Sequence, residues 1–405
     1  MVSTTSFWKA GHRPTLLAVF LYYDTSFMVW VLLGSLGVQI ARDLGLTVAQ
    51  QGLMVAVPVL SGAILRIVMG VFVDHFGPKR AGSGGQLILI VTLLLAWYFG
   101  IHSYRQALLL GVMLGVAGAS FAVTLPLASR WYPPEHQGRA LAIAAAGSSG
   151  AAIASWLAPS LSMTYGWINV FGFALIPLLL VFMLYLRVAK EAPERPPRKS
   201  LSAYLKVLKD KDAWWFMFFY SVSFGGFVGL ASSLNIYFDI QFGMGPKMAG
   251  LYTAVCVMVG SMARTLGGRI ADRVGGIRSL SVIYGVAAFF LTVVSFGLPQ
   301  AWMALIAFVC AMIALGMGNG AVFQLVPQRF RKEIGVMTGL VGMAGGLGGF
   351  YLASSLGFSE QLTGSYQAGL LVFAALTLLA LAGLTGVKKR WRTTWGAAHL
   401  TAAKI

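Results

Sequence analysis

Long apolar segments recur along the whole chain of 405 residues and leave little room for a soluble fold. Each segment has roughly 20 residues, which is enough for a helix to cross a ~30 Å hydrocarbon core. Only 10% of the residues are charged, whereas soluble domains average about 25%. A transmembrane β-barrel is not expected, because its strands would alternate in hydrophobicity over about 10 residues. We expect an all-α membrane protein with twelve transmembrane helices, near residues 15–39, 50–73, 82–101, 105–129, 138–160, 167–188, 213–238, 248–271, 279–298, 301–325, 333–357 and 364–387.

The net charge of +18 is distributed unevenly along the chain. Of 30 Lys and Arg residues, 25 fall in the tails and the even-numbered loops between spans. The odd-numbered loops carry only Arg42, Arg105 and Lys247, and Arg66 and Arg264 lie inside spans. This is the positive-inside pattern. It predicts both termini in the cytoplasm, and it explains the basic surplus without a nucleic-acid partner.

An internal repeat divides the chain into two halves. Eleven residues between 52 and 80 fall on identical residues when the sequence is shifted by 198 positions, and Arg66 falls on Arg264. A charged, proline-bearing segment separates the sixth and seventh spans. We therefore expect two pseudo-symmetric six-helix halves, the arrangement of the major facilitator fold. The predicted parts are an N-terminal half (1–188), a cytoplasmic linker (189–212), a C-terminal half (213–388) and a basic cytoplasmic tail (389–405).

The two arginines within spans are the strongest functional signal. Charged residues inside a membrane are costly and usually functional. Asp24 is the one acidic residue placed well within a predicted span, so neither arginine has an obvious acidic partner. A bound anion would offset both charges, and the planar guanidinium suits a planar oxyanion. The alternative is that helix-end carbonyls and Asp24 satisfy Arg66 and Arg264.

Glycine-rich segments occupy equivalent places in the two halves. They contain Gly147 and Gly150 in the fifth span and Gly345, Gly346 and Gly348 in the eleventh. Such helices can approach their neighbours closely or expose backbone to a small substrate. Close packing and a narrow substrate pathway both remain open.

The loops after the second and eighth spans carry a repeated pattern of charge. Asp74 and Arg80 in the first loop match Asp272 and Arg278 in the second. We expect ion pairs that bridge neighbouring helices on the cytoplasmic side and act as a gate. The alternative is a set of solvated loop charges.

Several stretches resemble the nitrate/nitrite porter family of the major facilitator superfamily. Among them are SGAILRIVMGVFVDHFGPKR, GSMARTLGGRIADRVGG and VGMAGGLGGF. The resemblance implies that Arg66 and Arg264 hold the substrate and that the rings of Phe121, Tyr220 and Phe224 lie against a flat anion. The family often has Asn where this chain has Ser148. A second polar candidate is Asn319.

The predicted function is secondary transport of nitrate, nitrite or both by alternating access, as used in nitrate assimilation. The absence of a conventional proton relay favours nitrate/nitrite exchange. Proton-coupled nitrate symport through Asp24 is the alternative. A transporter of organic anions and a nitrate-binding membrane sensor are further alternatives. We expect a monomer in the bacterial inner membrane, whose partners are nitrate, nitrite and the lipid bilayer. No enzymatic activity, cofactor or metal is expected.

Overall fold

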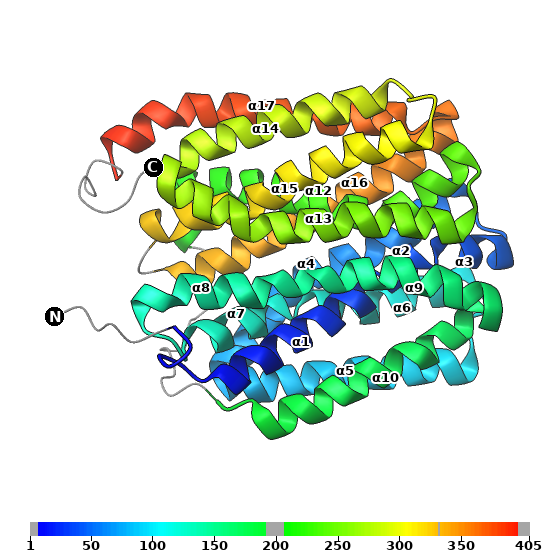
Figure 1. Ribbon diagram of the computed structural model, residues 1–405, viewed down its shortest axis with the longest axis horizontal. Coiled ribbons are helices and arrows are strands. Elements are labelled where there is room, and N and C mark those ends of the chain that lie inside the picture. The colour runs from blue at the N-terminus through cyan, green and yellow to red at the C-terminus, as the bar shows by residue number, and fades with distance from the viewer. Residues whose placement is uncertain (1–6, 192–205, 331–332, 396–405) are drawn as a thin grey trace.

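The computed structural model describes residues 7–191, 206–330 and 333–395, except for the side chains of residues 134, 135 and 138. These residues form helices joined by short turns (Figure 1). The N-terminal half contains α1 (Arg13–Trp30), α2 (Leu32–Ser35), α3 (Gly37–Leu44), α4 (Val48–Phe76), α5 (Pro78–Phe99), α6 (Tyr104–Gly118), α7 (Phe121–Ser129), α8 (Pro134–Ala145), η1 (Ala146–Ser149), α9 (Gly150–Tyr165) and α10 (Trp167–Val188). The C-terminal half contains α12 (Lys211–Phe242), α13 (Gly245–Val274), α14 (Gly276–Ser295), α15 (Ala301–Arg329), α16 (Ile334–Thr363) and α17 (Gln367–Thr393).

The prediction of twelve crossings is confirmed. In the described ranges, 11 helical stretches are long and apolar enough to cross a membrane. The first crossing is made by α1, α2 and α3 in succession, with breaks at Val31 and Leu36. Several helices extend beyond the apolar runs. For example, a capping box formed by Thr47 and Gln50 starts α4, because it satisfies backbone N–H groups that the first turn leaves unpaired.

The sequence repeat has a structural counterpart at the ends of α4 and α13. Gly77 ends α4 with φ +87°, and Gly275 ends α13 with φ +104°. A residue with a side chain is strained at such angles, so glycine is required at both turns. Gly77 and Gly275 are 198 positions apart, as the repeat demands.

The two halves pack through pseudo-equivalent helix pairs. Helix α4 lies against α16, and α13 lies against α9. A Cβ on Gly52 would lie 2.9 Å from the Cα of Gly357, and one on Gly250 would lie 2.4 Å from the carbonyl oxygen of Ser155. Only glycine permits this approach, because any side chain would push the backbones apart. The repeat therefore fixes how the halves meet.

Polar side chains join the two halves at one end of the bundle, which we call the distal end. This is the end opposite the start of α1 and the end of α17 (Figure 1). There Arg42 forms an ion pair of 3.0 Å with Asp239, and the backbone N–H of Ala49 donates to the side-chain oxygen of Gln361 at 2.9 Å. The distal end thus joins the two halves.

A second charged cluster lies at the opposite end, within the C-terminal half. Asp212 at the start of α12 accepts hydrogen bonds from Arg329, Arg390 and Trp391. Trp391 is buried and stacks on Phe216. Helix α17 extends to Thr393 and so includes the first residues of the predicted tail (389–405).

Candidate functional site

Arg66 lies on α4 at the centre of the bundle and is 1% exposed. Its Nε donates to the carbonyl of Gly118 at 3.0 Å, and its Nη1 donates to the carbonyl of Gly342 at 2.5 Å. Gly118 is the last residue of α6, whereas Gly342 belongs to α16 in the other half. The third nitrogen, Nη2, is buried and has no hydrogen-bond partner in the part of the chain that the structure describes. A buried unpaired donor is costly, and a ligand would remove the cost.

Arg264 lies on α13 and is 7% exposed. Its Nη2 donates to the hydroxyl of Tyr220 at 3.3 Å. The hydroxyl of Tyr23, on α1, also lies close to both guanidinium groups. The two cations of the internal repeat therefore share one buried centre, with tyrosine hydroxyl groups beside them.

Two phenylalanine rings lie close to both arginines. The guanidinium carbon of Arg66 is 5.0 Å from the ring centroids of both Phe121 and Phe224. That of Arg264 is 5.8 Å from Phe121 and 5.9 Å from Phe224. The ring of Tyr220 stacks on Phe224, with centroids 5.1 Å apart and planes 4° from parallel. The structure thus brings together the five residues for which the resemblance implied a substrate role.

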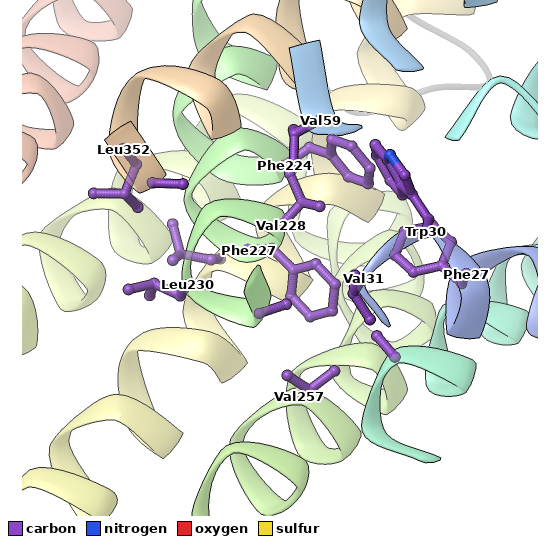
Figure 2. Close-up of a cluster of buried hydrophobic side chains, with 14 of the residues drawn as sticks. Phe27, Trp30, Val31, Val59, Phe224, Phe227, Val228, Leu230, Val257 and Leu352 are labelled. Atoms are coloured by element: carbon purple, nitrogen blue, oxygen red, sulfur yellow. The ribbon is translucent and has the colours of Figure 1, made fainter. Parts of the chain in front are cut away.

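Three aromatic residues of the site were not singled out from the sequence. Trp30 lies 5.5 Å from the guanidinium carbon of Arg66, and its Nε1 donates to the carbonyl of Pro58 at 2.8 Å. Figure 2 shows Trp30 and Phe224 within the buried apolar cluster at this level. Phe323 on α15 contacts Phe121 and Tyr220. Tyr23 on α1 lies close to both guanidinium groups. Tyr23 and Trp30 lie in an aromatic-rich first span, but composition alone does not show that their rings face the arginines.

Ser148 and Asn319 lie near the arginines. Among the described residues, no hydrogen bond links either side chain to Arg66 or Arg264. Ser148 forms a short hydrogen bond with Ser261 of α13, three residues before Arg264. Asn319 is buried on α15, and its Oδ1 is unpaired within the described ranges. The next residue, Gly320, packs closely against the backbone of Arg264. A direct role in substrate binding remains a prediction for both residues.

The glycine-rich helices make mainly close packing contacts. A Cβ on Gly147 or Gly150 would lie 2.8 Å or 1.8 Å from a carbonyl of α1, and one on Gly348 would lie 2.0 Å from a carbonyl of α12. Gly345 lies against the rings of Tyr220 and Phe224, and Gly346 lies against α4 across the halves. The packing interpretation accounts for these contacts, and the substrate pathway stays a prediction.

Asp24 faces the fifth crossing. Its Oδ1 accepts a hydrogen bond of 2.6 Å from Ser149, and the backbone of Gly150 lies next to the same carboxylate. Across the described ranges, no ion pair that we observe links Asp24 to Arg66 or Arg264. The helix-end carbonyl of Gly118 bonds Arg66, as the alternative interpretation expects, but Gly342 lies within α16 and Asp24 bonds Ser149 instead.

The predicted gating residues have local partners. Asp74 lies near Arg130, which follows α7, and Asp272 hydrogen-bonds with Gln324 of α15. Arg80 and Arg278 are exposed. Their gating role stays a prediction, and the ion pair Arg42–Asp239, which joins the halves, lies at the distal end.

The fold is that of solved transporters. Over 92% of this chain and 97% of the other, it matches the xylose transporter XylE from E. coli with a TM-score of 0.72 at 14% identity. A bacterial homologue of the human lysosomal transporter Spinster matches with a TM-score of 0.69 at 18% identity, over 92% of this chain and 96% of the other. These matches give the fold: two six-helix halves around a buried central site.

Sequence comparison gives the family. Residues 15–353 match the Major Facilitator Superfamily. The nitrite extrusion protein of Bacillus subtilis is 32% identical over 88% of this chain and 89% of its own length. The probable nitrate/nitrite transporter NarK2 of Mycobacterium tuberculosis is 31% identical over 88% and 91%, and the probable nitrate/nitrite antiporter NarK1 of Thermus thermophilus is 29% identical over 91% and 90%. The chain belongs to the Major Facilitator Superfamily and, within it, to the family of these nitrate and nitrite transporters, which confirms the resemblance seen in the sequence.

Proposed function

We propose that the chain exchanges nitrate and nitrite across the membrane, with Arg66 and Arg264 holding the anion. The observation that carries the proposal is the buried, unpaired Nη2 of Arg66 beside a second buried guanidinium. Charge-assisted hydrogen bonds to an oxyanion would satisfy this donor and offset both cations. The names of the relatives support the same substrates.

The surrounding rings favour a small, planar anion. Phe121 and Phe224 contact both guanidinium groups, and each is almost fully buried. A flat anion can lie between such rings and accept hydrogen bonds at its edge from Arg66 and Tyr220. A tetrahedral anion such as sulfate would need the rings to separate. The site therefore selects by shape as well as by charge.

The charge balance favours exchange over symport. When the site is empty, two guanidiniums face one centre; at a separation on the order of 10 Å and an effective dielectric of about 20, they repel by about 2 kcal/mol. A bound monovalent anion lowers the net positive charge that the closed site must enclose. The transporter therefore changes conformation more easily with an anion bound than with an empty site. Asp24, the carboxylate on which symport would depend, hydrogen-bonds with Ser149 instead.

Uptake into proteoliposomes tests this proposal. We expect rapid nitrate uptake into vesicles loaded with nitrite, slow uptake into vesicles without an exchangeable anion, and little effect of a pH gradient. Excess external sulfate should not compete. Robust uptake into empty vesicles driven by an inward proton gradient would contradict exchange and establish symport. Strong competition by sulfate would contradict selection by shape.

We also infer the placement of the protein in the membrane. The excess of Lys and Arg in the tails and even-numbered loops supports an inner-membrane protein with both termini in the cytoplasm. The distal end would then face outward. The pseudo-symmetric halves enclose the arginines within one chain, which supports transport by a monomer. Labelling of single cysteines from either side tests the orientation, and labelling at the Arg42–Asp239 end from the cytoplasm would contradict it.

A further inference from the structure

The fifth crossing is broken near the level of the site. Helix α8 ends at Ala145, a 3₁₀ turn (η1) covers Ala146–Ser149, and α9 begins at Gly150. A 3₁₀ stretch within a helix often marks a functional hinge. The corresponding crossing of the other half, α16, is a single helix of 30 residues. The break therefore belongs to the N-terminal half and is not a feature of the repeat.

One face of η1 lies directly on α1. A Cβ on Gly147 would lie 2.8 Å from the carbonyl oxygen of Phe20, and one on Gly150 would lie 1.8 Å from that of Asp24. The Asp24 side chain reaches over this contact, and its Oδ1 accepts from the Ser149 hydroxyl at 2.6 Å. The carboxylate also lies next to the backbone of Gly150, the first residue of α9.

The opposite face of η1 meets the half of the molecule that carries Arg264. Ser148 forms its short hydrogen bond with Ser261, which lies one turn before Arg264 on α13. Ser148 and Ser149 are adjacent, so one turn of chain is bonded to α1 through Ser149 and to α13 through Ser148. This turn connects Asp24 to the helix that presents Arg264.

We propose that Asp24 is a positioning residue: it fixes η1 against α1 so that Ser148 meets α13 beside Arg264. The proposal rests on the proposed function of Arg264 as an anion ligand. The role needs a hydrogen-bond acceptor at position 24 and does not need a group that gains and loses a proton. It therefore separates Asp24 from a proton carrier, which must titrate.

Three substitutions distinguish these roles. Asp24→Asn keeps an acceptor for Ser149 but cannot carry a proton, Asp24→Ala removes the acceptor, and Ser149→Ala removes the donor. We expect Asp24→Asn to retain nitrate/nitrite exchange with an unchanged pH profile. Asp24→Ala should raise the KM for nitrate about tenfold, the loss expected for one hydrogen bond to a charged group, with a smaller change in kcat. Ser149→Ala should change KM in the same direction.

A cross-link measures the position of η1 without any substrate. Cysteines at Ser148 and Ser261, in a background with Cys256→Ser and Cys310→Ser, report whether η1 meets α13 when an oxidant such as copper phenanthroline is added. We expect rapid disulfide formation with Asp24 or Asp24→Asn and at least about fivefold slower formation with Asp24→Ala.

The results separate the two proposals. An unchanged KM and cross-linking rate in Asp24→Ala, or loss of exchange in Asp24→Asn, would overturn the positioning role. A wild-type protein that exchanges no nitrate, but whose cross-link still depends on Asp24, would contradict the proposed function and support the contact. Retained exchange in Asp24→Asn together with a raised KM in Asp24→Ala would support both.

Discussion

Arg66→Lys tests the chemistry of the site most directly. Arg66 uses Nε and Nη1 on the carbonyls of Gly118 and Gly342 and leaves Nη2 for a ligand. A lysine keeps the charge, but its single ammonium cannot occupy all three positions. Each hydrogen bond to a charged group contributes about 1.5–3 kcal/mol. If part of the loss is recovered by rearrangement, we expect nitrate binding to weaken by about 3 kcal/mol, roughly a hundredfold in Kd.

The assay is nitrate binding to purified protein by calorimetry, followed by exchange in proteoliposomes. The matched control is Arg269→Lys, because Arg269 is an exposed arginine on α13, the helix that carries Arg264. The control should bind nitrate like the wild type, and a cooperative melting transition in each variant shows that it is folded. If Arg66→Lys bound nitrate within about threefold of the control, a difference below 1 kcal/mol, the argument that a planar donor set holds the anion would be wrong.

Three further predictions concern the rings, the glycine packing and the distal end. Phe121→Ala should weaken nitrate binding about tenfold by calorimetry, because the ring contacts both guanidiniums; unchanged affinity would exclude a role for its face. Gly150→Ala should lower the melting temperature or prevent folding, because its Cβ would meet a carbonyl at 1.8 Å, whereas Gly84→Ala, which meets no atom within 4 Å, should not. Asp239→Asn should speed amide hydrogen exchange at the distal ends of α3 and α12 by about two- to fivefold, a small effect because Arg42 is 65% exposed and its ion pair is screened; equal exchange rates would show that the pair does not hold the halves together.

The membrane fold could be predicted because its signals are local. A run of about 20 apolar residues specifies a spanning helix wherever it lies in the chain. The repeat then paired Arg66 with Arg264, and the buried centre contains both of them. The first crossing was harder. Gly37 directly follows the break at Leu36, but the break at Val31 has no proline or glycine beside it, so no local signal marks where α1 ends.

The sequence by itself determined the class of protein, the division into halves and the central pair of cations, since hydropathy, repeat and charge are properties of the linear chain. Only the tertiary structure decided what each side chain meets. It placed Trp30 and Tyr23 beside the arginines, gave Arg66 a carbonyl from the opposite half, and turned Asp24 toward Ser149. The physical reason is that these partners lie on different helices, and the rotation and crossing of the helices, set by close glycine contacts, decide which faces meet.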